Sequence, residues 1–154
     1  MSIEKIIVGA GCFWGVESTF SRIPGVVNTT CGYCGGNAPH PSYEMVCTGE
    51  TGHAEVVLVE YDTSVIPLNA LLEAFWQCHD PTTKDRQGVD VGSQYRSAIY
   101  FFTEDQEKSA RLSRDAAQQS GRWKAPIVTE IQHAAPFYPA EDYHQRYFEK
   151  KGIG

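Results

Sequence analysis

Residues 53–61 read HAEVVLVEY, and this segment has the clearest strand pattern in the chain. It is nearly continuous in apolar residues, which is typical of a strand inside a sheet. Because much of the segment is apolar on both faces, alternation alone does not say which way Glu55 points. The preceding residues 35–52 are rich in Gly, Pro, Ser and Thr, and we expect a long loop there, which in a compact domain is usually functional.

Helix and strand patterns continue on both sides of this segment. We expect strands at 3–9, 26–33, 94–102 and 127–131, helices at 13–23, 67–77 and 103–119, and a short helix at 140–150. The order β-α-β-β-α-β-α-β contains the split βαβ arrangement. The sequence therefore predicts an α+β two-layer sandwich, with helices against one face of a mixed sheet.

Length and charge limit the classes of function. A chain of 154 residues fits one domain, which we expect to span residues 1–154. The net charge is −6 and no basic cluster is present, so neither nucleic acid nor an anionic membrane is an expected partner. No apolar run approaches the ~20 residues of a membrane helix. The N-terminus is too short and too mixed in composition for a signal peptide, so we expect a cytoplasmic protein.

The chain contains five cysteines, at positions 12, 31, 34, 47 and 78. An odd number of cysteines in a reducing compartment argues against a framework of structural disulfides. Buried thiols, a metal site, or redox and nucleophilic chemistry remain as explanations.

Cys12 follows Gly9-Ala10-Gly11 at an expected strand-to-helix junction. The unpaired N–H groups and the dipole of a helix start stabilise a thiolate, so we predict a lowered pKa and a nucleophilic role for Cys12. The alternative is a small buried thiol at a helix start. Phe13 and Trp14 follow directly, and they are either core residues or the walls of an apolar pocket for a small alkyl group.

Five motifs resemble those of the peptide methionine sulfoxide reductase A family, in the order in which that family carries them. They are GCFWG (residues 11–15), TGHAE (51–55), HDPT (79–82), QYRSAIY (94–100) and AEDYHQ (140–145). The resemblance extends over about residues 5–149. It implies an α+β fold with a ferredoxin-like βαββαβ core and an enzyme that reduces the S epimer of methionine sulfoxide, free or in proteins.

The resemblance also implies site residues. Matched by motif, they are the nucleophile Cys12, the methyl-pocket walls Phe13 and Trp14, the acid Glu55, the oxygen-binding Tyr43 and Tyr95, and the site aspartate Asp90. A thiolate can attack the sulfur of a sulfoxide only if the departing oxygen receives a proton or strong hydrogen bonds. Glu55 must therefore hold a proton at neutral pH, and we predict that apolar surroundings raise its pKa.

Attack by Cys12 would release methionine and leave a sulfenic acid on Cys12. A second thiol would then condense with the sulfenic acid, and an external dithiol would return the enzyme to its reduced form. No cysteine follows Cys78, so we do not expect the resolving cysteine in a C-terminal tail that many family members carry. Cys34, which we favour, or Cys47 would resolve the sulfenic acid. Alternatively, an external thiol such as thioredoxin, glutaredoxin or glutathione would reduce it directly. We expect a monomer with no bound cofactor and no metal.

The sequence is also compatible with other hypotheses about these residues. Cys31 and Cys34 have the spacing of a dithiol redox motif, and with Cys47 and His53 they could hold zinc. A thiol hydrolase would use Cys12 and His53. A binding module would explain the aromatic residues but not a cysteine at a helix start. We expect structural roles for two of the thiols and four polar motif residues, namely Cys31, Cys78, His79, Asp80, Asp142 and His144.

Overall fold

The apolar segment HAEVVLVEY forms most of β3 (Ala54–Asp62), an inner strand of a six-stranded sheet. In the computed structural model, which describes residues 2–152, the strand order is β7-β6-β1-β3-β2-β8. Residues 1, 153 and 154 of the expected domain lie outside the described residues. The sheet is mixed, because β6 and β7 are parallel whereas the other neighbours are antiparallel. The remaining strands are β1 (Ile3–Ala10), β2 (Val26–Cys34), β6 (Ser97–Phe101), β7 (Glu130–His133) and β8 (Tyr138–Pro139).

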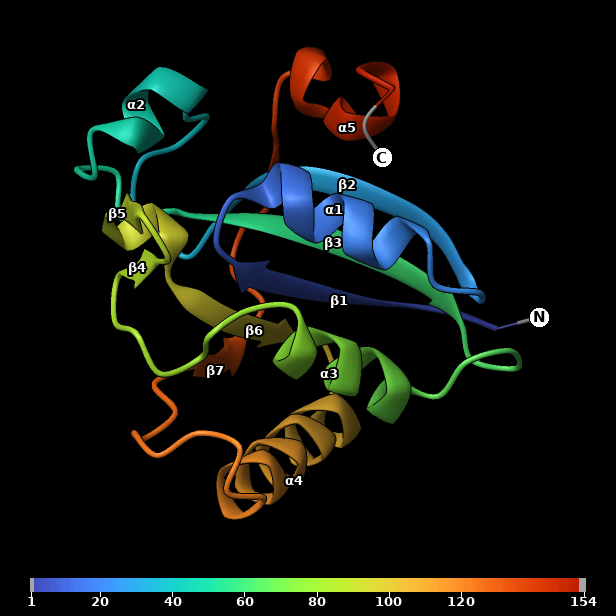
Figure 1. Cartoon of the computed structure of the whole chain (residues 1–154). Helices are drawn as coiled ribbons and strands as arrows, with labels where there is room; N and C mark the ends of the chain where they lie inside the picture. Colours follow the sequence, from blue (N-terminus) through green and yellow to red (C-terminus); the bar gives the residue numbers. More distant parts are fainter. Residues whose placement is uncertain (1, 153–154) are drawn as a thin grey trace.

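Helices cover one face of this sheet, as predicted (Figure 1). They are α1 (Phe13–Ser21), α3 (Leu68–Gln77) and α4 (Glu104–Gln119). The apolar stripe of α3 turns inward and buries Leu71, Leu72 and Phe75, each of which contributes about 1.5–3 kcal/mol of burial free energy. α4 starts where the Thr103 side chain accepts a hydrogen bond from the Gln106 N–H, so a side-chain cap sets the beginning of this polar helix.

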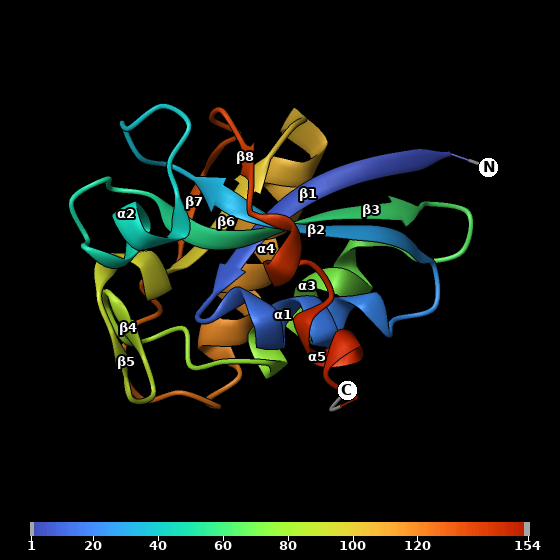
Figure 2. The ribbon, with the colours of Figure 1, turned by 90° about the horizontal axis from the view of Figure 1, so that it is seen from above.

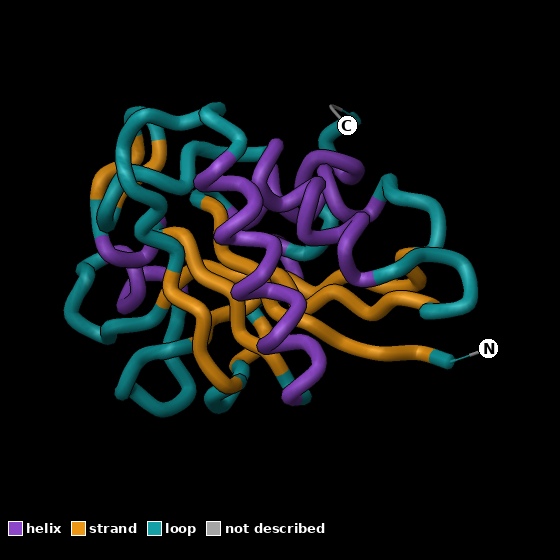
Figure 3. The backbone as a smooth tube through the Cα atoms, turned by 90° about the horizontal axis from the view of Figure 1, so that it is seen from below, coloured by secondary structure: helices purple, strands orange, loops and turns teal. Residues whose placement is uncertain are grey.

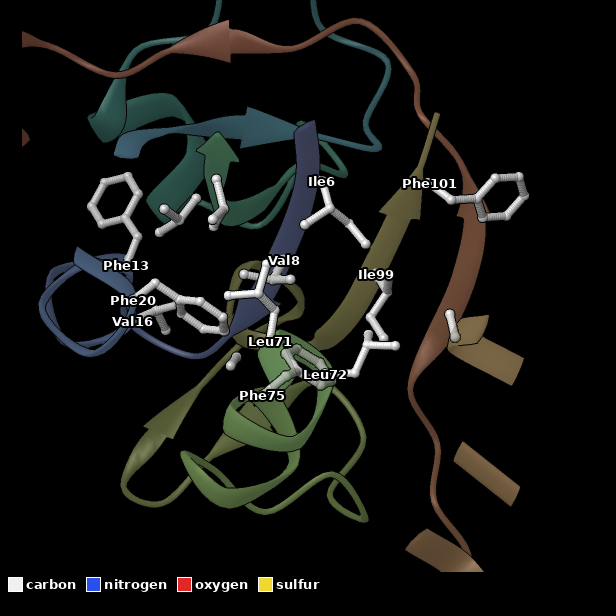
Figure 4. Close-up of a cluster of buried hydrophobic side chains, with 14 of the residues drawn as sticks. Ile6, Val8, Phe13, Val16, Phe20, Leu71, Leu72, Phe75, Ile99 and Phe101 are labelled. Carbon is white, nitrogen blue, oxygen red and sulfur yellow. The ribbon is translucent and has the colours of Figure 1, made fainter. Parts of the chain in front are cut away.

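The core consists of two clusters, one on each face of the sheet. The larger lies under the helices and contains the side chains labelled in Figure 4, among them Ile6, Val8 and Phe20. The smaller lies on the opposite face, where Ile7, Val56 and their neighbours are covered by the segment that contains residues 134–137. Because both faces of β3 are covered, its run of apolar residues is explained.

Several boundaries differ from the predictions. The loop expected at 35–52 contains α2 (Tyr43–Cys47), a short helix capped by the Ser42 side chain. Between the helix expected at 67–77 and the strand expected at 94–102, the chain forms the hairpin of β4 (Arg86–Gln87) and β5 (Asp90–Val91). The last predicted strand, at 127–131, starts three residues later as β7. The helix expected at 140–150 consists of two short helices. These are η2 (Asp142–His144) and α5 (Tyr147–Lys150), separated where Arg146 adopts a left-handed φ of 54°.

Several segments that carry predicted site residues lie at one end of the sheet. Figures 1 and 2 both place α2 and the β4–β5 hairpin at the end where β1 stops and α1 begins. The short helix η1 (Ser93–Tyr95) packs against β4 and β3. Figure 3 shows loops gathered at this end, away from the N-terminus. Within residues 2–152, no helix is both long and apolar enough to cross a membrane.

Candidate functional site

Cys12 occupies the tight turn between β1 and α1. Gly11 has a φ of 100°, and a Cβ at this position would lie 2.9 Å from Cγ of Gln87, so glycine allows both the turn and the close approach of the β4 strand. Cys12 is the N-cap residue of α1 and is half-buried. Its sulfur lies where the backbone N–H groups of Trp14 and Gly15 can donate to it.

The pKa of Cys12 departs from the expectation. Burial raises it, and the charges of Glu55 and Asp90 raise it further, while hydrogen bonds from the Trp14 and Gly15 N–H groups lower it. The predicted net lowering is therefore wrong, because desolvation and two acidic neighbours outweigh the helix terminus. Neutralising Glu55 removes one of these opposing charges, so the ionisation of Cys12 depends on the protonation of Glu55.

Glu55 is a buried acid with one unused oxygen. Its side chain is 1% exposed, and its Oε1 atom accepts a hydrogen bond of 3.2 Å from the Phe13 N–H. Oε2 is buried with no partner among the described residues. Burial raises the pKa of Glu55 to about 7, the Asp90 charge adds to the rise, and the Phe13 N–H opposes it. The predicted rise is confirmed, and a large share of Glu55 is protonated at neutral pH.

Tyr43 and Tyr95 bring two hydroxyl groups to the same place. Tyr43 starts α2 and Tyr95 ends η1, and both side chains are half-buried. Burial raises the pKa of Tyr95 to about 12, with further rises from the charges of Glu55, Asp90, Cys47 and Cys12. Burial also raises the pKa of Tyr43, followed by its interaction with the Cys47 thiol. Both hydroxyls therefore stay protonated at neutral pH and can donate hydrogen bonds.

Asp90 joins this group from the hairpin. It pairs with Gln87 across β4 and β5 and is half-buried. Its charge contributes to the raised pKa values of Cys12, Glu55 and Tyr95, so it lies within electrostatic reach of all three. The structure thus brings Asp90 to the predicted site.

The two aromatic residues after Cys12 differ in their surroundings. Phe13 is 1% exposed and packs in the large core cluster, with its ring stacked against Tyr43 at 6.3 Å between centroids. Trp14 is half-buried. Its indole Nε1–H donates a hydrogen bond of 2.9 Å to Nδ1 of His144, and its ring stacks on Tyr147 at 3.8 Å. Phe13 is therefore a core residue as well as a candidate pocket wall, whereas Trp14 keeps an accessible surface.

The other cysteines separate into two groups. Cys34 is fully buried in the smaller cluster, on the sheet face away from the helices, and donates to the carbonyl of Ala135. Cys47 is exposed at the end of α2 and interacts with the Tyr43 hydroxyl. This placement does not support the preference for Cys34 as the resolving thiol, because the sheet separates it from the α1 side. Cys31 and Cys78 donate hydrogen bonds to neighbouring main-chain or carboxyl oxygens, as structural thiols do.

The structure does not bring together the residues that the dithiol, thiol hydrolase and zinc hypotheses require. Cys31 and Cys34 belong to different core clusters on opposite faces of β2, so they cannot act together as a dithiol. Both ring nitrogens of His53 are engaged, by the Gly36 N–H and the Ala38 carbonyl, which leaves this ring no role as a base for Cys12. Among residues 2–152, no three His, Cys, Asp or Glu side chains are grouped so that they could hold a metal ion.

Two residues around the site were not predicted. Glu17 is a buried acid on the apolar face of α1, and a carboxyl group between Phe13 and Phe20 on that face was the signal in the sequence. Glu141 lies in the AEDYHQ motif but was given no role. Its carboxyl oxygens accept hydrogen bonds from the Tyr33 hydroxyl and the Tyr43 N–H, at 2.9 and 3.0 Å.

Comparisons with known proteins agree on one family. The family model described as peptide methionine sulfoxide reductase matches residues 4–153. The peptide methionine sulfoxide reductase MsrA of Methanoculleus marisnigri is 54% identical over 153 residues, which cover 99% of this chain and 93% of the relative. The A2-1 reductase of Oryza sativa is 57% identical over 97% of this chain and 79% of its own length.

Two solved structures have a similar fold. The reduced form of Mxr1 from Saccharomyces cerevisiae aligns with a TM-score of 0.91 at 36% identity, over 99% of this chain and 87% of that one. The structure of Mxr1 in complex with Trx2 aligns with a TM-score of 0.67 at 25% identity, over 94% and 84% of the two chains.

Proposed function

Because the chain belongs to the peptide methionine sulfoxide reductase family, an oxidoreductase family that reduces methionine sulfoxide, we propose that it converts the S epimer, free or in proteins, to methionine. One observation carries this proposal. Glu55 is a buried acid with a pKa of about 7 and an unused oxygen, and it lies beside a cysteine at a helix start. A sulfoxide needs this combination of a soft nucleophile and a proton donor.

Substrate binding uses the walls and the hydroxyl groups of the site. We propose that Phe13 and Trp14 hold the S-methyl group, and that the sulfoxide oxygen lies against Glu55, Tyr43 and Tyr95. The unused Oε2 of Glu55 would carry the proton that this oxygen accepts. Because the methyl group and the oxygen have separate subsites, the two sulfur epimers cannot both be seated in the reactive orientation. The pocket therefore selects one epimer.

The chemical step transfers the oxygen from one sulfur to the other. The Cys12 thiolate attacks the sulfoxide sulfur and forms an S–S bond to it, while Glu55 donates its proton to the oxygen. The hydroxyl group then moves to the Cys12 sulfur as the substrate's S–O bond and this S–S bond break, and methionine is released. The oxygen ends on Cys12 as a sulfenic acid, so the cysteine sulfur loses two electrons and the substrate sulfur gains two. Glu55 regains a proton when the Cys12 thiol, regenerated by the external dithiol, ionises for the next turnover. Tyr43 and Tyr95 stabilise the oxygen through hydrogen bonds while its charge develops.

Recycling requires a second thiol. We propose that Cys47 is the better placed of the two internal candidates, since it is exposed beside Tyr43 on the α1 side of the sheet. Its thiol would displace water from the sulfenic acid and form a disulfide, which an external dithiol then reduces. The complex of the related Mxr1 with Trx2 favours a thioredoxin-like reductant. We propose a monomer without a bound cofactor, formed by one catalytic domain.

The strand order also supports a more specific description of the fold. Along β1-α1-β2-β3-α3-β6, the four strands lie in the spatial order β6-β1-β3-β2 and are antiparallel. We infer that this segment is a ferredoxin-like core, because each helix connects two strands that are separated by a third.

A stoichiometric assay with separate S and R epimers tests the proposed function. Reduced wild-type protein should form about one methionine from the S epimer without added reductant and almost none from the R epimer. Cys12→Ser should form none, because it lacks the nucleophile. Equal reduction of both epimers would contradict the selectivity, and turnover by Cys12→Ser would contradict the nucleophile assignment.

Mass spectrometry after one equivalent of substrate tests the resolving thiol. Wild-type protein should lose the mass of two hydrogens through a disulfide between Cys12 and Cys47. Cys47→Ser should instead retain the added oxygen, while the matched variant Cys34→Ser should behave as wild type. A stable sulfenic acid in the wild type would reject both internal candidates.

A further inference from the structure

The orientation of Trp14 is set from outside its own helix. Trp14 lies in the first turn of α1, where it is half-buried. Two residues near the C-terminus hold its indole ring. Tyr147 stacks on it with a centroid distance of 3.8 Å and an interplanar angle of 7°, and His144 accepts the hydrogen bond from Nε1–H. A segment about 130 positions away therefore fixes this candidate pocket wall.

The hydrogen bond defines the state of His144. An indole N–H can only donate, so Nδ1 of His144 must be the acceptor and carries no proton. The ring is fully buried, and it contacts Phe13, Tyr43 and Tyr143 at centroid distances of 5.0, 4.4 and 4.0 Å. Burial lowers the pKa of His144, in keeping with a neutral ring that is protonated on Nε2.

The C-terminal segment (residues 140–147) is fastened to the body of the protein. The Gln145 side chain accepts from the Cys31 N–H at 2.8 Å and donates to the Cys31 carbonyl at 2.9 Å, as a neighbouring strand would. The Glu17 carboxyl group accepts from the Arg146 N–H at 2.6 Å. These bonds are made by buried or half-buried groups, so the segment gives His144 a rigid support.

The same segment also holds the oxygen side of the site. Glu141 accepts the Tyr43 N–H and the Tyr33 hydroxyl, which ties the start of α2 to β2. The C-terminal segment thus contacts both the wall proposed for the methyl group, Trp14, and one donor proposed for the oxygen, Tyr43. Epimers at sulfur differ by exchanging methyl and oxygen positions, so their discrimination depends on how rigidly these two sides are held.

We propose that His144 is a positioning residue for this reaction. Through the hydrogen bond that its Nδ1 accepts from Trp14, it fixes the wall of the methyl pocket and thereby sets the preference for the S epimer. This inference rests on the proposed function, since it concerns the selectivity of that same site. His144 does not contact the reacting atoms, and its effect passes through the orientation of the Trp14 ring.

Two substitutions at this position separate positioning from simple packing. His144→Phe keeps a ring but removes the acceptor, whereas His144→Asn keeps an acceptor oxygen close to the place of Nδ1. We expect His144→Phe to raise KM for the S epimer by about tenfold, with kcat changed by less than about threefold, because a wall is loosened while the nucleophile is intact. The ratio of kcat/KM for the S over the R epimer should fall by about tenfold. His144→Asn should recover most of both losses.

His133→Phe is the matched control, because His133 is an exposed histidine on β7 whose substitution should leave all parameters unchanged. If His144→Phe has the KM and epimer ratio of the wild type, or if Asn and Phe at position 144 are equally impaired, the inference is overturned. In either case, S-selective reduction by the wild type would still support the proposed function.

Nuclear magnetic resonance of the wild type provides a test that needs no variant. The ¹⁵N shifts of His144 should show a bare Nδ1 and a protonated Nε2, and a through-bond coupling should connect Nδ1 to the Trp14 indole N–H. A proton on Nδ1 would contradict the inference even if the His144 variants failed to fold.

Discussion

Glu17, within α1, and Glu55, next to the start of α1, are both buried acids, yet their hydrogen-bond partners differ. Glu17 is 2% exposed and Glu55 is 1% exposed. Glu17 accepts hydrogen bonds from the Thr29 hydroxyl at 2.9 Å, the Cys31 thiol at 3.3 Å and the Arg146 N–H at 2.6 Å. Glu55 accepts one, from the Phe13 N–H, and its second oxygen has no partner among the described residues.

Burial alone therefore does not give an acid the features on which the role proposed for Glu55 depends. The oxygens of Glu17 are occupied by donors from β2 and the C-terminal segment, so its carboxyl group serves as a structural link. Glu55 retains an oxygen that no neighbour satisfies, and its pKa of about 7 lets it hold a proton when substrate binds. The cysteine next to each acid differs too. The sulfur of Cys12 accepts hydrogen bonds from two backbone N–H groups, whereas the thiol of Cys31 donates a hydrogen bond to Glu17.

The largest expected effect concerns activity. Glu55→Gln should lower kcat/KM for the S epimer at neutral pH by about 100- to 10,000-fold, because an amide cannot supply the proton. Glu17→Gln should stay within about tenfold of the wild type, since its oxygens accept structural hydrogen bonds from Thr29, Cys31 and Arg146. Steady-state kinetics on both variants, with circular dichroism as a check of folding, measures the contrast. A greater loss for Glu17→Gln would reverse the assignment of the two acids.

A second prediction concerns how stability depends on pH. The pKa of Glu55 is raised from about 4.5 when unfolded to about 7 when folded. Between these values the folded state holds a proton that the unfolded state lacks, so the free energy of unfolding falls as pH rises, by about 3 kcal/mol in total. Urea unfolding of the wild type and Glu55→Gln across this range should show the fall in the wild type only. Parallel curves for the two proteins would contradict a raised pKa.

A third prediction concerns the structural acid. Glu17→Ala leaves the Thr29 hydroxyl, the Cys31 thiol and the Arg146 N–H without their acceptor, so the free energy of unfolding should fall by about 2–4 kcal/mol. Thermal or chemical unfolding measures this loss. Glu17→Ala as stable as the wild type would mean that these hydrogen bonds do not hold the C-terminal segment in place.

The smallest expected effect separates one contact of Glu17. Thr29→Val removes a single donor and should cost about 1 kcal/mol. Thr30→Val, at the next position of β2, is the matched control and should change stability by less than about 0.5 kcal/mol. Equal effects at the two positions would show that the Thr29–Glu17 bond contributes little.

The sequence predicted the order of the main elements and named residues that the structure brings together, but it did not predict the surroundings of those residues. The run HAEVVLVEY became β3 with a shift of one residue, because a long apolar segment leaves little choice. The two-residue strands β4 and β5 were missed, since so short a hairpin has no periodicity. The net rise in the pKa of Cys12 was also missed, because it depends on how close Glu55 and Asp90 lie in space. The role of His144 required the same tertiary information.

The pH dependence of a single turnover tests the account most directly. The proposed mechanism needs ionised Cys12 and protonated Glu55 together, so the wild-type rate should rise with pH up to about 7 and then level off, as Glu55 loses its proton while Cys12 gains charge. In Glu55→Gln the rate should be far lower and should keep rising above pH 7 toward the pKa of the thiol. An identical break near pH 7 in both proteins, or equal rates at neutral pH, would contradict the role of Glu55 as the acid.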